Sequence, residues 1–182
     1  MAKPVSLART MMVGWMLSAL FCAAPAFAET EDSFQVSATI SSGCSVDGVG
    51  TSGSAGDMGT LDFGQDSVFS TATHSTSLVG NQNIRLRCTV GANLRMTIGG
   101  GQNSASGVRN LQRTGHPEQR IQYRLYSNAG MTNEIAIGVE QPIAVTSGNA
   151  QDIPLPIYAR LTLPGTYAAG AYSDIIQVTL TW

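Results

Sequence analysis

The sequence is poor in the residues on which most enzymes and nucleic-acid-binding proteins depend. It has one lysine, Lys3, two histidines and three cysteines, and only 12% of its 182 residues are charged. The arginines are scattered and the formal net charge is −2, so no basic patch would attract a nucleic acid. We therefore expect no nucleic-acid partner.

Long hydrophobic runs are also missing, except for one near the start of the chain. Positively charged residues precede an apolar stretch at 11–24, and Ala26 and Ala28 then form an A-x-A pattern. This order is typical of a secretory signal peptide. The apolar stretch is too short to span a bilayer comfortably. We expect residues 1–28 to be removed and residues 29–182 to be exported without spanning a membrane.

Two cysteines remain outside this signal, Cys44 and Cys88. In an exported protein an even pair most simply forms one disulfide. The loop that it closes is about 45 residues long, and closing it is worth roughly 4 kcal/mol by the loss of chain entropy in the unfolded state. The alternatives are two free buried thiols or a metal site. Neither histidine lies at ligand spacing to a cysteine, so we expect no metal.

The rest of the sequence is typical of an all-β protein. Short runs of alternating apolar and polar residues are separated by stretches rich in Gly, Asn, Ser and Asp. The runs are 34–40, 83–90, 94–98, 121–126, 135–139, 153–163 and 176–182. No window has a convincing 3.6-residue apolar period. Many short strands joined by turns predict a β-sandwich.

Two local features refine this prediction. The turn residues at 91–93 lie between two alternating runs and predict a hairpin. Pro154 and Pro156 cannot donate to a ladder of backbone hydrogen bonds. The run at 153–163 is therefore expected to be an edge strand or to be bulged.

No group of residues in the sequence predicts catalysis. His74 and His116 lie in polar, loop-like stretches, and no G-x-S-x-G motif is present. Asp57, Asp62 and Asp66 are close in sequence but lack the spacing and the distal Glu of an EF-hand, so a solvated acidic loop is the better interpretation. We expect no enzymatic activity, no catalytic residues, no cofactor and no metal.

Apolar alternation reaches both ends of the exported region. At the start, the alternating residues are Phe34, Val36, Ala38 and Ile40. At the end, they are Ile176, Val178, Leu180 and Trp182. Both faces must be buried. They are either two ordinary strands of one sandwich, which the pattern alone favours, or one of them adds a strand to a neighbouring molecule.

A series of motifs carries a family likeness. They are ISSGCSV at 40–46, GTLDFG at 59–64, NIRLRCT at 83–89, YRLYSNA at 123–129, IPLPIYARL at 153–161 and GAYSDIIQVTLTW at 170–182. In this order they resemble the spore coat protein U domain family, the subunit type of archaic, Csu-type chaperone–usher pili. The paired cysteines and the G-x-Y-x-D stretch, with Gly170, Tyr172 and Asp174, are the most specific parts. The segments 65–82 and 100–120 carry little signal.

The resemblance implies an immunoglobulin-like sandwich that lacks its final strand and has a long hydrophobic groove. A periplasmic chaperone would fill the groove with a strand, and at the outer-membrane usher the N-terminal segment of the next subunit would replace it. The chain would then be a structural pilin in an extracellular fibre that supports attachment and biofilm formation. Its partners would be neighbouring subunits, the chaperone and the usher.

The resemblance also assigns roles to segments and residues. The sandwich domain would span 44–182, and the segment 29–43 would carry the candidate donor strand. Phe34, Val36, Ala38 and Ile40 are the donor candidates, although they could instead form the domain's own first strand. The residues that would line the groove and contact the chaperone are Ile176, Val178, Leu180 and Trp182. Because residues 29–182 contain no lysine, Lys–Asn isopeptide bonds cannot reinforce the fibre.

Two other functions remain open. The first is a secreted, monomeric β-sandwich module that binds carbohydrate, and the second is a coat or matrix protein that associates with itself. A carbohydrate-binding module needs an exposed aromatic platform. Trp182 is the only tryptophan after residue 28, which weakens this alternative. A shaft subunit and a minor adaptor subunit both fit a single domain.

Overall fold

The computed structural model describes residues 35–80 and 85–182. These residues form twelve β-strands and no helix, which confirms the predicted all-β class. The chain divides into two units, Met1–Thr39 and Ile40–Trp182, and every strand lies in the second. No described residue belongs to a helix that could cross a membrane.

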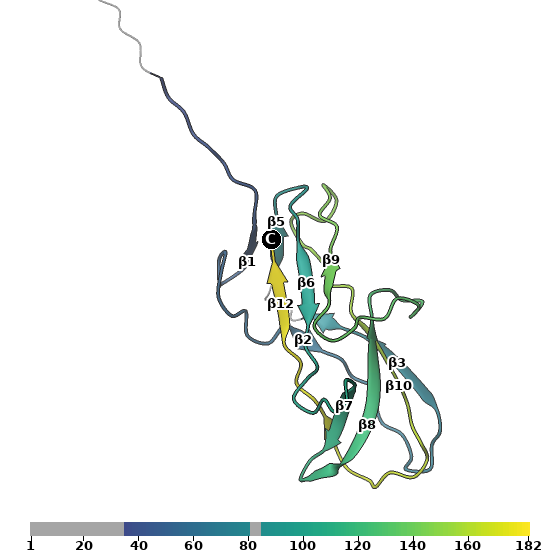
Figure 1. Cartoon of the computed structure of the whole chain (residues 1–182). Coiled ribbons are helices and arrows are strands. Elements are labelled where there is room, and N and C mark those ends of the chain that lie inside the picture. The colour runs from purple at the N-terminus through teal and green to yellow at the C-terminus, as the bar shows by residue number, and fades with distance from the viewer. Residues whose placement is uncertain (1–34, 81–84) are drawn as a thin grey trace, which may run out of the picture. The chain divides into compact units, whose positions relative to one another are not determined.

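The largest sheet has five antiparallel strands in the order β11-β7-β8-β10-β3 (Figure 1). They are β3 (Thr73–Ser77), β7 (Arg109–Arg113), β8 (His116–Tyr126), β10 (Tyr158–Thr162) and β11 (Tyr172–Ser173). The register places Tyr123 opposite Leu161 and Leu125 opposite Ala159. All four are buried, because side chains directly opposite each other point to the same face of a sheet.

The second layer consists of shorter pieces. A three-stranded sheet has the order β12-β6-β9, and β1 pairs with β5. These strands are β1 (Cys44–Val46), β5 (Leu86–Cys88), β6 (Arg95–Ile98), β9 (Glu140–Pro142) and β12 (Val178–Thr181). A short ladder joins β2 (Gly59–Thr60) to β4 (Val79–Gly80).

Inward-facing residues of both layers form one hydrophobic core, as the sandwich prediction requires. Met96 and Ile98 of β6 and Leu125 of β8 are fully buried, and Leu86 and Leu161 are nearly so. The alternation predicted at 94–98 and 121–126 is confirmed. The larger sheet and the smaller pieces therefore share a single apolar interior.

The hairpin prediction at 91–93 is wrong. The chain does turn there, because the Ala92 N–H donates to the Thr89 carbonyl at 2.9 Å. However, β5 pairs with β1, whereas β6 pairs with β12 and β9. The disulfide holds β5 to β1, and the Gly91 N–H donates to the Val145 carbonyl at 3.2 Å instead of facing a hairpin partner. The turn therefore connects two sheets.

Two strand predictions also need correction. Residues 135–139 form no strand: Ile135 is buried, but Gly138 has a φ of +72° and turns the chain. β10 begins after both prolines, and it lies between β8 and β3, not at a sheet edge. The prolines are accommodated because they precede the ladder.

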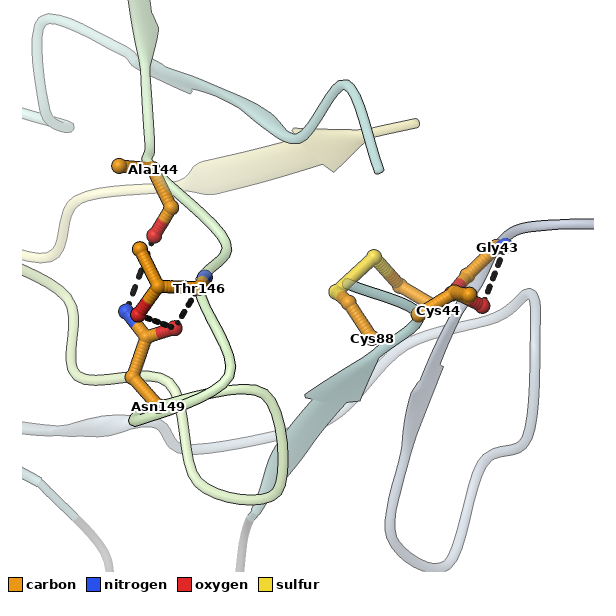
Figure 2. Close-up of a disulfide and its surroundings, with 7 residues drawn as sticks. Gly43, Cys44, Cys88, Ala144, Thr146 and Asn149 are labelled. Atoms are coloured by element: carbon orange, nitrogen blue, oxygen red, sulfur yellow. Dashed lines mark hydrogen bonds between the residues drawn. A yellow bond between two sulfur atoms is a disulfide. The ribbon is translucent and has the colours of Figure 1, made fainter. Parts of the chain in front are cut away.

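The predicted disulfide joins Cys44 of β1 to Cys88 of β5 (Figure 2). The two residues are directly opposite in the β1–β5 register, with a Cα–Cα distance of 4.0 Å. Next to the bridge, the Thr89 hydroxyl accepts the Gly43 N–H at 3.1 Å and donates to the Gly43 carbonyl at 3.2 Å. Both cysteines are buried, so the disulfide links β1, the first strand, to β5 within the core.

Replacing both cysteines, Cys44→Ser with Cys88→Ser, is expected to lower the free energy of unfolding by roughly 4 kcal/mol, because the unfolded chain regains the entropy of an open loop. Urea denaturation followed by circular dichroism measures this change. The control is Cys22→Ser, which should have no effect if residues 1–28 are removed. An unchanged unfolding midpoint for the double variant would contradict the expected role of the disulfide.

Candidate functional site

The last strand, β12, lies at the edge of its sheet. One side pairs with β6, from Val178 opposite Ile98 to Thr181 opposite Arg95. On its other side, no strand of the described chain pairs with it. Figure 1 shows β12 between β6 and β1. An unpaired strand edge presents free backbone N–H and C=O groups and is a template for another strand.

A groove of 1230 Å³ runs along β12. One wall is formed by residues 174–180 with Trp182, and the other by residues 53–61 with Phe63. The large apolar side chains that line it include Leu61, Phe63, Leu78, Leu111, Leu125, Leu155, Ile157, Ile176, Val178, Leu180 and Trp182. Most of them are only partly buried although they pack on the core, so along this groove the core is incompletely covered.

All four C-terminal residues singled out from the sequence line this groove. Ile176, Val178 and Leu180 are half-buried against the core, whereas the residues at 177 and 179 between them are exposed. Trp182 is 41% exposed, and a methyl group added at Gly43 would lie 3.7 Å from its indole ring. The period of two therefore places one continuous apolar row on the groove wall.

The donor candidates differ from these residues in their exposure. Phe34 lies outside the described residues. Val36 is 82% exposed and Ile40 is 94% exposed, and Ala38 is exposed as well. Residues 35–43 form no strand. The alternation at 35–40 therefore does not correspond to a strand in the structure.

One end of the groove carries a polar cluster around Asp174. The Tyr123 hydroxyl donates to Asp174 Oδ2 at 2.7 Å, and the backbone N–H and side-chain Nδ2 of Asn103 donate to Oδ1 at 3.0 and 3.1 Å. Burial, together with the bond to Asp174, raises the pKa of the Tyr123 phenol far above its usual value. The phenol therefore remains a hydrogen-bond donor.

Arg109 stabilises the backbone at the end of β6 and after β8. It is 4% exposed, and its guanidinium donates to the carbonyls of Ile135, Gly99 and Ile98 at 2.7, 3.0 and 3.2 Å. Burial lowers the pKa of this guanidinium, but arginine still stays protonated in a protein. One side chain thus satisfies carbonyls at the end of β6 and in the segment after β8.

The other polar candidates lie at the surface. Asp57 and Asp62 accept the N–H groups of Gly59 and Gly64 at 3.0 and 2.8 Å and so stabilise turns. Asp66 Oδ2 lies 2.8 Å from His74 Nε2, and hydrogen bonds, first from Ser70, lower the pKa of this carboxyl. In the part of the chain that the structure describes, no three His, Cys, Asp or Glu residues gather as metal ligands.

Sequence reasoning did not identify one wall of the groove or the polar cluster. Residues 53–59, which are rich in glycine and have no alternating apolar pattern, belong to this wall. The alternation of Leu61 and Phe63 in the GTLDFG motif was a usable signal for this wall. Nothing in the local pattern indicated that Asn103 and Asp174 would meet.

A β-sandwich with an open strand edge along an apolar groove defines a domain that exposes part of its own core. Comparison with known protein families matches residues 30–179 to the Spore Coat Protein U domain, and the chain belongs to this family. This confirms the resemblance found in the sequence. Membership places the chain among structural proteins and not among enzymes.

Solved structures provide more distant likenesses. The chaperone–tip adhesin complex of CFA/I fimbriae matches with a TM-score of 0.41 and 20% identity, over 60% of this chain and 33% of that chain. The CsuC–CsuE chaperone–tip adhesion subunit pre-assembly complex from the archaic chaperone–usher Csu pili of Acinetobacter baumannii matches with a TM-score of 0.41 and 17% identity, over 79% and 40%. This chain therefore spans less than half of either matched chain. No curated protein matches the sequence significantly.

The role of Arg109 can be tested by Arg109→Met. This change should lower the free energy of unfolding by about 3 kcal/mol or more, because buried carbonyls lose their donor. The matched control is Arg95→Met, which removes an exposed ion pair with Glu140 and should cost less than about 1 kcal/mol. Urea denaturation compares the two variants. Equal losses of unfolding free energy in the two variants would contradict the stabilising role of Arg109.

Proposed function

We propose that this chain is a structural subunit of a chaperone–usher surface fibre and that its groove accepts a donor strand from another molecule. The observation that carries the proposal is the unpaired edge of β12 beside a partly exposed apolar row. An added strand would pair with this edge and cover that row. Signal peptide, donor segment and sandwich domain would then be residues 1–28, 29–43 and 44–182.

Burial of the donor's side chains provides enough free energy for stable assembly. Three or four apolar side chains at about 1.5–3 kcal/mol each give roughly 5–12 kcal/mol, before the cost of ordering the donor. New backbone hydrogen bonds to β12 add to this and remove the open edge. A fibre linked in this way is long-lived without covalent bonds between its subunits.

The segment 29–43 is the proposed donor. Phe34, Val36, Ala38 and Ile40 alternate with the same period of two as the apolar row on the groove wall. The lack of a strand at 35–43 supports the donor role over that of the domain's own first strand. The donor segment therefore offers four apolar side chains to a groove wall that carries four apolar side chains.

The fibre pathway supplies the remaining partners. Before assembly, a periplasmic chaperone strand occupies the groove and protects β12 from nonspecific pairing. At the outer-membrane usher, the donor segment of the next subunit replaces the chaperone strand. The finished fibre is extracellular and supports adhesion and biofilm formation.

Val36→Arg should abolish polymerisation without destabilising the monomer, because the side chain is 82% exposed before assembly and would be buried after it. Unboiled samples of periplasmically expressed protein should show a ladder of multimers on an SDS gel for wild type, and boiling should collapse the ladder. Deleting residues 29–40 should have the same effect as Val36→Arg. The control is Thr39→Arg, on the opposite face of the donor, which should keep the ladder. A wild-type protein that is folded and yet forms no ladder would refute self-polymerisation and favour the monomeric carbohydrate-binding module.

A mixing experiment tests the two halves of the interaction separately. Leu180→Arg places a charge in the groove wall but leaves the donor intact, whereas Val36→Arg does the reverse. Neither variant should multimerise alone, and a mixture of the two should give dimers and nothing longer. Thr181→Arg, on the exposed face of β12, is the control and should polymerise like wild type. Ladders from Leu180→Arg alone would show that the groove is not the acceptor.

A further inference from the structure

The G-x-Y-x-D stretch ends in Asp174, and the proposed function gives this residue no role. Asp174 is half-buried and immediately precedes the segment that leads into β12. Its carboxylate accepts hydrogen bonds from Tyr123 of β8 and from two nitrogens of Asn103. The Asn103 side chain also donates to the Ser173 carbonyl at 2.9 Å. We call Asp174, Tyr123, Asn103 and Gly101 the Asp174 cluster.

The backbone of Gly101 lies directly against the Asp174 carboxylate. Its φ is +85°, and a methyl group built on it would lie 2.7 Å from the Asp174 Cγ and overlap Oδ2. Any other residue would therefore push the carboxylate out of its place. Because glycine has no side chain, the loop backbone can approach the carboxylate closely and fix its position.

Backbone hydrogen bonds extend this attachment toward β12. The Gln102 N–H donates to the Ile175 carbonyl and the Gly99 N–H to the Gln177 carbonyl, both at 3.0 Å. They continue the β6–β12 pairing past the end of the strand. The segment 174–177 is thus attached to the loop after β6 by both its backbone and its side chain.

We propose that Asp174 is a positioning residue for strand acceptance: the Asp174 cluster holds residues 174–177 against the loop at 99–103 and thereby fixes the open edge of β12 for the incoming strand. This inference rests on the proposed function. The physical reason is that β12 has a partner on one side only, so its position depends on attachments beyond the strand itself. Three directional hydrogen bonds to one carboxylate fix a geometry that apolar contacts alone leave loose.

The decisive variant is Gly101→Ala, and Gly107→Ala is its matched control. Both glycines lie in the same connection and have left-handed φ values, +85° and +76°, so both substitutions carry the same backbone cost. A methyl group at Gly107 meets nothing within 4 Å, whereas at Gly101 it displaces Asp174. The difference between the two variants therefore isolates the cluster.

Hydrogen exchange of the full chain, resolved by mass spectrometry, gives the first readout. We expect Gly101→Ala to accelerate amide exchange in residues 174–182 by at least about tenfold relative to Gly107→Ala, because the segment opens locally. The multimer ladder gives the second readout and should be lost in Gly101→Ala alone. Equal exchange in the two variants would overturn the proposal, and so would fast exchange with an undiminished ladder.

If Gly101→Ala does not fold, a pair of milder substitutions still tests the proposal. Tyr123→Phe removes only the hydroxyl that donates to Asp174, and Tyr126→Phe removes the hydroxyl that accepts from Arg160, outside the cluster. Only Tyr123→Phe should accelerate exchange in residues 174–182, by several fold, and shorten the ladder. If wild type forms no ladder, the proposed function fails, and exchange alone then decides whether the cluster holds this segment.

Discussion

The structure depends on one physical constraint, which is that apolar side chains must be covered although no strand among the described residues pairs with the free edge of β12. The five-stranded sheet and the β6 layer bury their inner faces against each other, and Leu125 and Ile98 are fully enclosed. Along β12 the same interior is only half covered. A free backbone edge and an unfinished core coincide here, so a single added strand would satisfy both. Assembly in this view completes folding.

The strand pattern was predictable where alternate residues of a strand are buried, as in β6 and in residues 121–126 of β8. Alternation identified β6 and β8 because their inner residues are enclosed by the opposite layer. The run at 135–139 has the same alternation, but the turn at Gly138 leaves Val139 49% exposed. The hairpin prediction failed because β5 pairs with β1, whose Cys44 lies 44 residues before Cys88, and not with β6, its neighbour in the sequence.

The candidate site was predictable on one wall only. The C-terminal wall contains β12 and keeps the same alternation on either side of it, so a period of two revealed its apolar row. Apart from the short strand β2, the opposite wall consists of irregular chain before Phe63, and its position is set by packing. The Asp174 cluster joins residues that are 51 and 71 positions apart, and such contacts leave no local signal in the sequence.

The position of Trp182 has a spectroscopic consequence. Its indole lies at the groove beside Gly43 and is 41% exposed. No other tryptophan follows residue 28, so if residues 1–28 are removed, as proposed, all tryptophan fluorescence of the chain comes from this one ring. Indole emission depends on contact with water, and the proposed incoming strand would change that contact. The domain therefore carries an intrinsic optical reporter at the place where a neighbouring molecule would join it.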